Sequence, residues 1–189
     1  MKKASILLLC VLMFSCTSVK KTDDEIKPVV YITDDIQLEL PDLELLDENL
    51  EMQQIIDGRY KDKTYTMPAY LLLNRQEISI VVFTALGNTV YELYYSGGEV
   101  KSSGLSSVVI SNPLYMIADL QFCYYPEDSL KEIMDDAGIR MEVQTLEGGW
   151  TRQFFADDDL IIEIKRVNNI LEYTNYLRDY SYRIEEYPV

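Results

Sequence analysis

Apolar and polar positions alternate, mainly with a period of two, through most of the chain after residue 50. This alternation is typical of strands with one buried face, and it predicts strands over residues 52–60, 65–75, 77–86, 89–96, 99–104, 139–144, 150–155, 160–165, 170–177 and 179–187. Glycine or asparagine pairs such as Gly97-Gly98 and Asn168-Asn169 separate successive runs and favour hairpin turns. The pattern therefore predicts nine or more antiparallel strands.

A different pattern in the middle of the chain predicts two helices. Asn112 followed by Pro113 is a typical N-cap and first helical residue, and residues 113–125 are apolar nearly all round, as in a buried helix. A second helix is expected from Pro126, because apolar residues recur at helical spacing at Leu130, Ile133, Met134 and Ala137. The glycine that follows is a typical C-terminal stop.

The first residues have the pattern of an export signal that ends at a cysteine. Two lysines precede an apolar run over residues 6–14. As a helix this run would reach only about 14 Å, too short for a ~30 Å hydrocarbon core. The run ends in Ser15-Cys16, which resembles the bacterial lipobox, where the cysteine is acylated and becomes the new N-terminus. We predict a signal peptide over residues 1–15 and lipidation of Cys16; a buried apolar strand with an incidental cysteine is the alternative.

Residues 16–49 are acidic and lack a clear period. The stretches "TDDEIK" and "LPDLELLDENL" place carboxylates among scattered leucines. This composition predicts a solvated tether between the lipidated Cys16 and a folded domain at residues 50–189. An acidic arm that docks a partner is the alternative.

Composition and charge exclude several classes of function. The formal net charge of −15 argues against binding to nucleic acid and against electrostatic adhesion to anionic lipid. The absence of histidine removes the usual Ser-His and Cys-His nucleophiles and the commonest metal ligand. Once Cys16 is lipidated, Cys123 has no disulfide partner in the mature chain, and its apolar surroundings predict an inert packed thiol. We therefore expect no catalysis, no cofactor and no metal site, and we read Asp157–Asp159 as a solvated turn.

Several short motifs carry a family resemblance. Residues 78–104 form a strand–turn–strand–turn–strand run, and residues 124–138, "YYPEDSLKEIMDDAG", lead into the second helix. In these segments the chain resembles the outer-membrane lipoprotein receptor LolB and its periplasmic relative LolA. Further motifs are "ALG" at 85–87, "YYSGG" at 94–98, "IADLQFCYYP" at 117–126 and "YSYRIEEY" at 180–187. On these the chain is still more similar to the domain-of-unknown-function 3261 family of bacterial lipoproteins.

The resemblance implies a fold and a function. The fold would be mainly β (α+β), with a strongly curved antiparallel sheet forming an incomplete LolA/LolB-like barrel and two central helices plugging the open side. The receptors bind the acyl chains of lipoproteins in an apolar hollow and pass them to the outer membrane. We therefore expect a cell-envelope protein, anchored in the outer membrane and facing the periplasm. It would bind or transfer a lipoprotein or another acyl-bearing lipid, with a periplasmic carrier as a partner.

Apolar side chains on the predicted sheet and helices are candidates for the wall of such a hollow. Each buried ligand methylene is worth roughly 0.8 kcal/mol, so an acyl chain needs no specific polar contact to bind. The candidate wall residues are Val82, Leu93, Leu120, Ile133, Met134, Met141 and Ile162. Ordinary core packing is the alternative for each of them. A non-catalytic docking lipoprotein with a filled core therefore stands beside the carrier hypothesis, and an enzyme is the third and weakest hypothesis.

Overall fold

The computed structural model describes residues 27–104 and 112–189. Twelve strands, one 3-10 helix and two α-helices lie in these ranges. The short N-terminal elements are β1 (Val29–Tyr31), β2 (Gln37–Glu39) and η1 (Leu43–Leu45), and the helices are α1 (Pro113–Tyr124) and α2 (Glu127–Asp136). The remaining strands are β3 (Leu50–Tyr60), β4 (Lys63–Leu73), β5 (Ile78–Phe83), β6 (Thr89–Ser96), β7 (Glu99–Gly104), β8 (Ile139–Leu146), β9 (Gly149–Ala156), β10 (Asp159–Val167), β11 (Ile170–Asn175) and β12 (Tyr180–Pro188).

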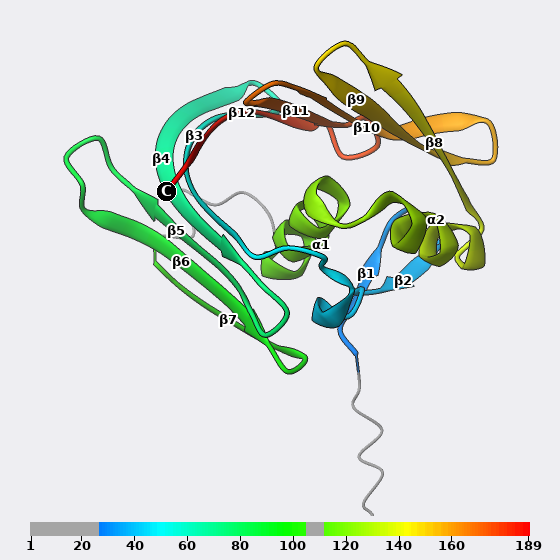
Figure 1. The fold of residues 1–189 in the computed structure, drawn as a ribbon, viewed down its shortest axis with the longest axis horizontal. Coiled ribbons are helices and arrows are strands. Elements are labelled where there is room, and N and C mark those ends of the chain that lie inside the picture. The colour runs from blue at the N-terminus through cyan, green and yellow to red at the C-terminus, as the bar shows by residue number, and fades with distance from the viewer. Residues whose placement is uncertain (1–26, 105–111) are drawn as a thin grey trace, which may run out of the picture.

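Ten strands form one antiparallel sheet in the order β7-β6-β5-β4-β3-β12-β11-β10-β9-β8. The last strand, β12, pairs with β3 and so joins the two halves of the sheet. The sheet bends around both helices and does not close, with β7 and β8 at its edges (Figure 1). These features confirm the prediction of a mainly β fold, with a large curved antiparallel sheet and two central helices.

Local sequence signals account for where the helices begin and end. The Asn112 side chain accepts a hydrogen bond from the Leu114 backbone N–H at 3.1 Å, and Pro113 occupies the first helical position, as predicted. Residues 117–123 of α1 are all buried, the polar Asp119 and Gln121 among them, so the helix is buried on every side, as predicted. In α2 the apolar face places Leu130 and Met134 in the core.

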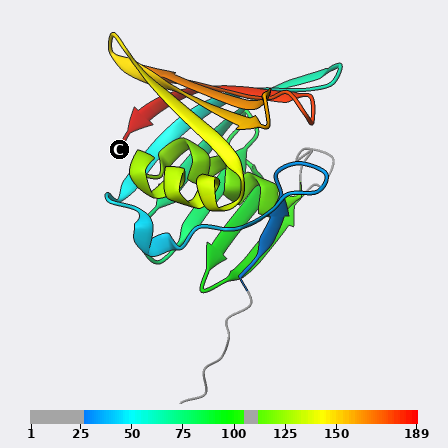
Figure 2. The ribbon, with the colours of Figure 1, turned by 90° about the vertical axis from the view of Figure 1, so that its right-hand side faces the viewer.

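The predicted tether is wrong for residues 27–49. This segment forms the antiparallel hairpin β1–β2 followed by η1, and its apolar side chains Val30, Ile32, Leu38, Leu40 and Leu46 are buried. In Figure 1 the helices lie between this hairpin and the strands β9–β12, and in Figure 2 the hairpin lies beside the helices. The folded domain therefore includes the segment from residue 27, because the leucines among its carboxylates cover the helices.

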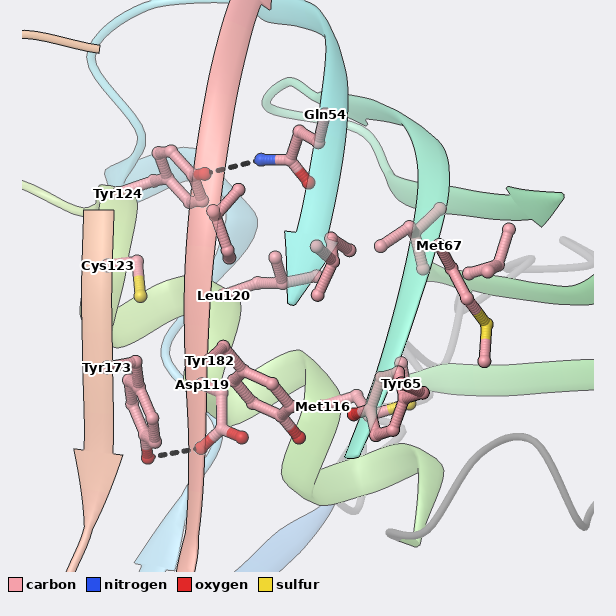
Figure 3. A pocket seen from close by; sticks show the side chains of 14 residues that line it. Gln54, Tyr65, Met67, Met116, Asp119, Leu120, Cys123, Tyr124, Tyr173 and Tyr182 are labelled. Atoms are coloured by element: carbon pink, nitrogen blue, oxygen red, sulfur yellow. Dashed lines mark hydrogen bonds between the residues drawn. The ribbon is translucent and has the colours of Figure 1, made fainter. Parts of the chain in front are cut away.

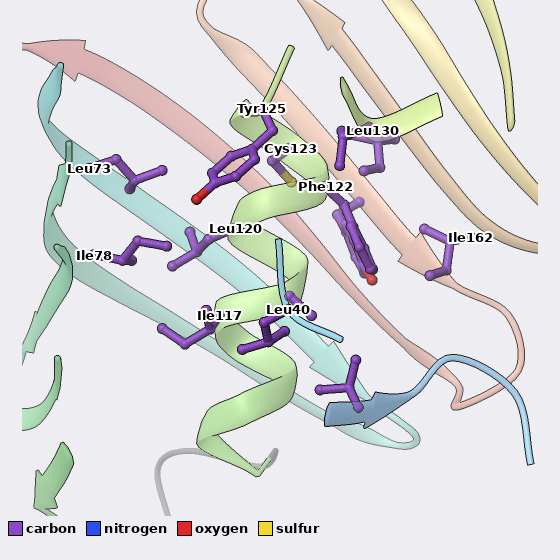
Figure 4. Close-up of a cluster of buried hydrophobic side chains, with 14 of the residues drawn as sticks. Leu40, Leu73, Ile78, Ile117, Leu120, Phe122, Cys123, Tyr125, Leu130 and Ile162 are labelled. Atoms are coloured by element: carbon purple, nitrogen blue, oxygen red, sulfur yellow. The ribbon is translucent and has the colours of Figure 1, made fainter. Parts of the chain in front are cut away.

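The hydrophobic core fills the space between the concave face of the sheet and α1. Leu73 and Ile78 approach the helix from one part of the sheet and Ile162 from the other, with Ile117 and Leu120 of α1 between them (Figure 4). Within the described ranges no helix is long and apolar enough to cross a bilayer.

Candidate functional site

A cavity of about 80 Å³ lies between the concave face of the sheet and α1. Its lining comes from β3, β4, β5, β11, β12 and α1 (Figure 3). Most of the lining side chains are apolar or aromatic, and the full set is Gln54, Ile56, Tyr65, Met67, Ile80, Val82, Met116, Asp119, Leu120, Cys123, Tyr124, Tyr173, Tyr182 and Ile184. Six of the lining residues are only half-buried: Ile56, Tyr65, Met67, Met116, Tyr124 and Tyr182. Tyr65, Met67 and Met116 lie close together at one side of the cavity (Figure 3), and we place its mouth beside them.

The register of the sheet builds the wall of the cavity. Ile56 lies opposite Met67 on one side and Ile184 on the other, so three neighbouring strands present apolar side chains in one row. In the next row Gly58 lies between Tyr65 and Tyr182. A Cβ atom at Gly58 would lie 2.1 Å from Cζ of Tyr65, so the tyrosine ring leans over β3 only because this residue is glycine.

One end of the cavity is polar and centres on the buried carboxyl group of Asp119. The Tyr173 hydroxyl donates to Oδ1 at 2.5 Å, and the Tyr180 hydroxyl lies 2.9 Å from both carboxyl oxygens. Burial raises the pKa of Asp119 to about 7, while these two hydrogen bonds and the charge of Arg178 act in the opposite direction. Asp119 therefore changes its charge near neutral pH.

A second polar group lies on β3. Gln54 is 1% exposed, and its Nε2 donates to the Tyr124 hydroxyl at 2.7 Å. The Tyr124 hydroxyl in turn donates to Oε1 of Glu186, which also forms an ion pair with Arg166 at 2.8 Å. The Gln54 carbonyl oxygen has no hydrogen-bond partner among the described residues. A buried polar atom left in this state costs about 1–3 kcal/mol, so it points to a missing donor.

The candidate wall residues fall into two groups. Val82 and Leu120 line the cavity. The other five lie outside its lining: Leu93, Met134, Met141 and Ile162 are buried in the core, and Ile133 is half-buried against it. Cys123 also lines the cavity; burial raises the pKa of its thiol, so the group stays protonated and unreactive at neutral pH.

The polar residues of the cavity were not among the predicted site residues, although the sequence carries a signal for two of them. Asp119 is the one charged residue in a helix that is apolar nearly all round, so a buried partner for it was to be expected. Gln54 shares the buried face of β3 with Met52 and Ile56. Nothing comparable marks Tyr173 or Tyr182 in the sequence, because tyrosines are frequent in these strands, on buried and exposed faces alike.

Some predicted features lie outside the described residues. The signal peptide at residues 1–15 and the lipidated Cys16 lie outside the described residues. Within residues 27–104 and 112–189 no three carboxylate or cysteine side chains gather in a way that could hold a metal ion.

Comparison with protein families gives one match. A family model described as "Protein of unknown function (DUF3261)" matches residues 51–188. The matched range covers the ten-stranded sheet and both helices almost completely, and it contains every residue that lines the cavity. A comparison with curated proteins finds no match.

Proposed function

The chain belongs to the DUF3261 protein family, and from this premise we propose that it is a lipid-anchored envelope protein that binds the apolar part of an acyl-bearing molecule. In this proposal Cys16 carries the anchor, and the domain faces the periplasm from the outer membrane. The cargo is a lipoprotein or another envelope lipid received from a periplasmic carrier, and the protein performs no catalysis. The curved open sheet, with two helices on its concave side, supports a LolA/LolB-like incomplete barrel.

The observation that carries the proposal is the apolar cavity between the sheet and α1. Its lining includes the aliphatic residues Ile56, Leu120 and Ile184, which give water no hydrogen-bond partner. Apolar cavities of this kind are poorly hydrated and accept apolar guests. Each methylene transferred from water into such a cavity contributes roughly 0.8 kcal/mol to binding.

The size of the cavity limits how much of a ligand it holds. Its volume of about 80 Å³ is roughly half that of an engineered cavity of about 150 Å³ that binds benzene. One end of a chain-like molecule therefore fits inside the cavity, whereas the rest of a long chain would lie at the mouth. Met67 and Met116 stand at this mouth, and their flexible side chains can move aside for a longer guest.

A specific observation favours a second function, a docking lipoprotein whose core is filled by its own side chains. The two helices already lie on the concave face, and residues 27–49 cover the helices in turn, with their buried apolar residues in the same core cluster. In that case the small cavity is a packing defect and the protein acts through its outer surface.

Lipid analysis of the purified protein separates the two functions. The chain would be purified from membranes under mild conditions, denatured and extracted, and the extract examined by mass spectrometry. We expect an acyl-bearing molecule, distinct from the anchor, in a ratio close to one per chain. A chain that carries no lipid, together with a protein core impermeable to small apolar probes, would favour the docking lipoprotein.

A further inference from the structure

The carboxamide of Gln54 is held in one orientation by a chain of hydrogen bonds that leads away from the cavity. Glu186 pairs with Arg166 and so serves as an acceptor. The Tyr124 hydroxyl donates its only proton to Glu186, and its oxygen can then only accept the hydrogen bond from Gln54. This order assigns Nε2 of Gln54 to Tyr124 and fixes Oε1 on the opposite side of the amide group.

The Gln54 oxygen is an unused acceptor in the wall of the cavity. The side chain lines the cavity and is 1% exposed, so bulk water does not solvate it. Oε1 has no partner among the described residues and points away from Tyr124, toward the side chains that surround the cavity (Figure 3). Buried carbonyl groups in folded proteins nearly always accept a hydrogen bond, so a hydrogen-bond donor on the ligand would satisfy Oε1 of Gln54.

The remaining polar lining disfavours an anionic guest. Asp119 presents a carboxyl group at the other polar site, where Tyr173 and Tyr180 donate to it. None of the described residues that line the cavity is lysine or arginine. A carboxylate or phosphate placed inside would therefore meet the two acceptors Gln54 and Asp119, and only tyrosine hydroxyls could donate to it. No cation would balance its charge, and burial of an unpaired charge is costly.

From these contacts we infer that the cavity selects an uncharged amphiphile. Such a molecule carries a hydroxyl or an amide N–H at one end of its apolar chain, and this group donates a hydrogen bond to Oε1 of Gln54. The inference rests on the proposed function, because it names the class of acyl-bearing molecule that the same cavity takes. Alcohols and amides of fatty chains and glycerides with a free hydroxyl belong to this class. Ionised fatty acids and plain hydrocarbons do not.

Methionine-methyl NMR of the full chain in phosphatidylcholine nanodiscs tests this selectivity, because this zwitterionic lipid has no hydrogen-bond donor and so lies outside the proposed class. The probes are 1-octanol, its isomer 1-methoxyheptane, which lacks the donor, and octanoate. Met67 and Met116 line the cavity and report binding, whereas Met134 and Met141 lie in the core outside it and serve as internal references. We expect 1-octanol to bind about tenfold more tightly than 1-methoxyheptane, as one satisfied hydrogen bond implies, and octanoate to bind more weakly still.

Two matched variants assign the preference to one atom. Gln54→Leu should abolish the preference for 1-octanol over 1-methoxyheptane; if this variant does not fold, Gln54→Met replaces it. Gln121→Leu is the control, because Gln121 is also buried with an unpartnered Oε1 but does not line the cavity. It should keep the preference of the unmodified chain.

The possible failures are distinguishable. Equal binding of 1-octanol and 1-methoxyheptane, or a preference that survives in the Gln54 variants, would overturn the inference and leave an apolar-ligand carrier intact. If none of the three probes shifts Met67 or Met116, the cavity takes no apolar guest and the proposed function itself fails.

Discussion

One buried carboxyl group, that of Asp119, gives the protein a pH-dependent stability. Burial raises its pKa in the folded protein to about 7, from 3.8 for a solvated aspartate. The unfolded chain therefore loses this proton at a lower pH than the folded protein. The contribution of Asp119 is fully present below pH 4 and is lost as the pH rises to about 7.

This shift predicts a specific difference between Asp119 and its amide analogue. The free energy of unfolding of the unmodified chain should fall by a few kcal/mol, on the order of 2–4, between pH 4 and pH 7.5, relative to that of Asp119→Asn. Urea unfolding of both proteins across this range measures the difference. The amide of Asp119→Asn cannot ionise, whereas all other carboxyl groups are the same in the two proteins. Their effects on stability therefore cancel in the comparison. Curves that run parallel with pH would show that Asp119 ionises normally.

Gly58 is the residue that allows the Tyr65 ring to lie over β3 beside the mouth of the cavity. A Cβ atom would lie 2.1 Å from the Tyr65 ring, so Gly58→Ala should destabilise the fold by about 1–3 kcal/mol, as overpacked cores do. The penalty should be much smaller in a Tyr65→Ala background, where the ring is absent. Urea unfolding of the four chains measures the coupling. An equal penalty in both backgrounds would mean that the two residues do not interact.

At the residue scale, sequence patterns predicted which side chains face inward but not which of them line a cavity. Val82 and Leu120 line it, whereas Ile133 and Met141 do not. A period of two or 3.6 identifies a buried face, but the depth of a side chain along that face depends on how far α1 stands from each strand. That distance is set by packing between segments far apart in the chain.

At the scale of elements, α1 forms the floor of the cavity and α2 does not contribute to it. Leu120 of α1 points into the cavity, and Leu130 of α2 is buried in the core away from it. Leu120→Ala should therefore enlarge the cavity and tighten binding of branched or longer apolar alcohols. Leu130→Ala should leave binding unchanged. Both should lower the free energy of unfolding by about 2–5 kcal/mol.

Titration of both variants with alcohols of increasing chain length, followed at Met67 and Met116, separates these effects. A gain in binding confined to Leu120→Ala agrees with a cavity floor at this residue. The same gain in Leu130→Ala would instead indicate that general loosening of the core admits the probes.

The elements themselves were largely predictable because their signals are local. The Asn112-Pro113 cap, the glycine turns and the period-two runs depend only on neighbouring residues. The structure has helices and strands at the positions that these signals predict. The hairpin β1–β2 was missed. Its strands have three residues each, and the surrounding carboxylates hide the few apolar positions that face the helices.

At the scale of the whole molecule, the pairing of β12 with β3 was beyond the sequence patterns. The pairs run from Tyr180 opposite Tyr60 to Pro188 opposite Met52. The alternation of apolar and polar residues determines which face of each strand is buried, but it carries no information about which strand pairs with it. Strands β3 and β12 are far apart in the sequence, and residues near either strand carry no signal for closing so long a loop. This pairing brings Gln54 beside Glu186 and so creates the polar wall of the cavity.

The proposed anchor predicts where the protein is found in the cell. Cys16→Ala should release the chain from the membrane fraction or leave it unprocessed, because the acyl chains and the cleavage site are both lost. Fractionation followed by mass measurement of the N-terminus checks this. Cys123→Ala is the matched control and should remain membrane-bound. Unchanged acylation of Cys16→Ala would refute the assignment.

Photo-crosslinking in intact envelopes tests most directly whether an apolar group occupies the cavity. A fatty alcohol with a diazirine close to its hydroxyl group would be added to cells and activated, and the labelled peptides of the protein identified by mass spectrometry. We expect label on cavity residues of three elements, Met67 of β4, Leu120 of α1 and Ile184 of β12, and competition by unlabelled fatty alcohol. Label confined to the convex face of the sheet, or insensitive to competitor, would contradict an occupied cavity.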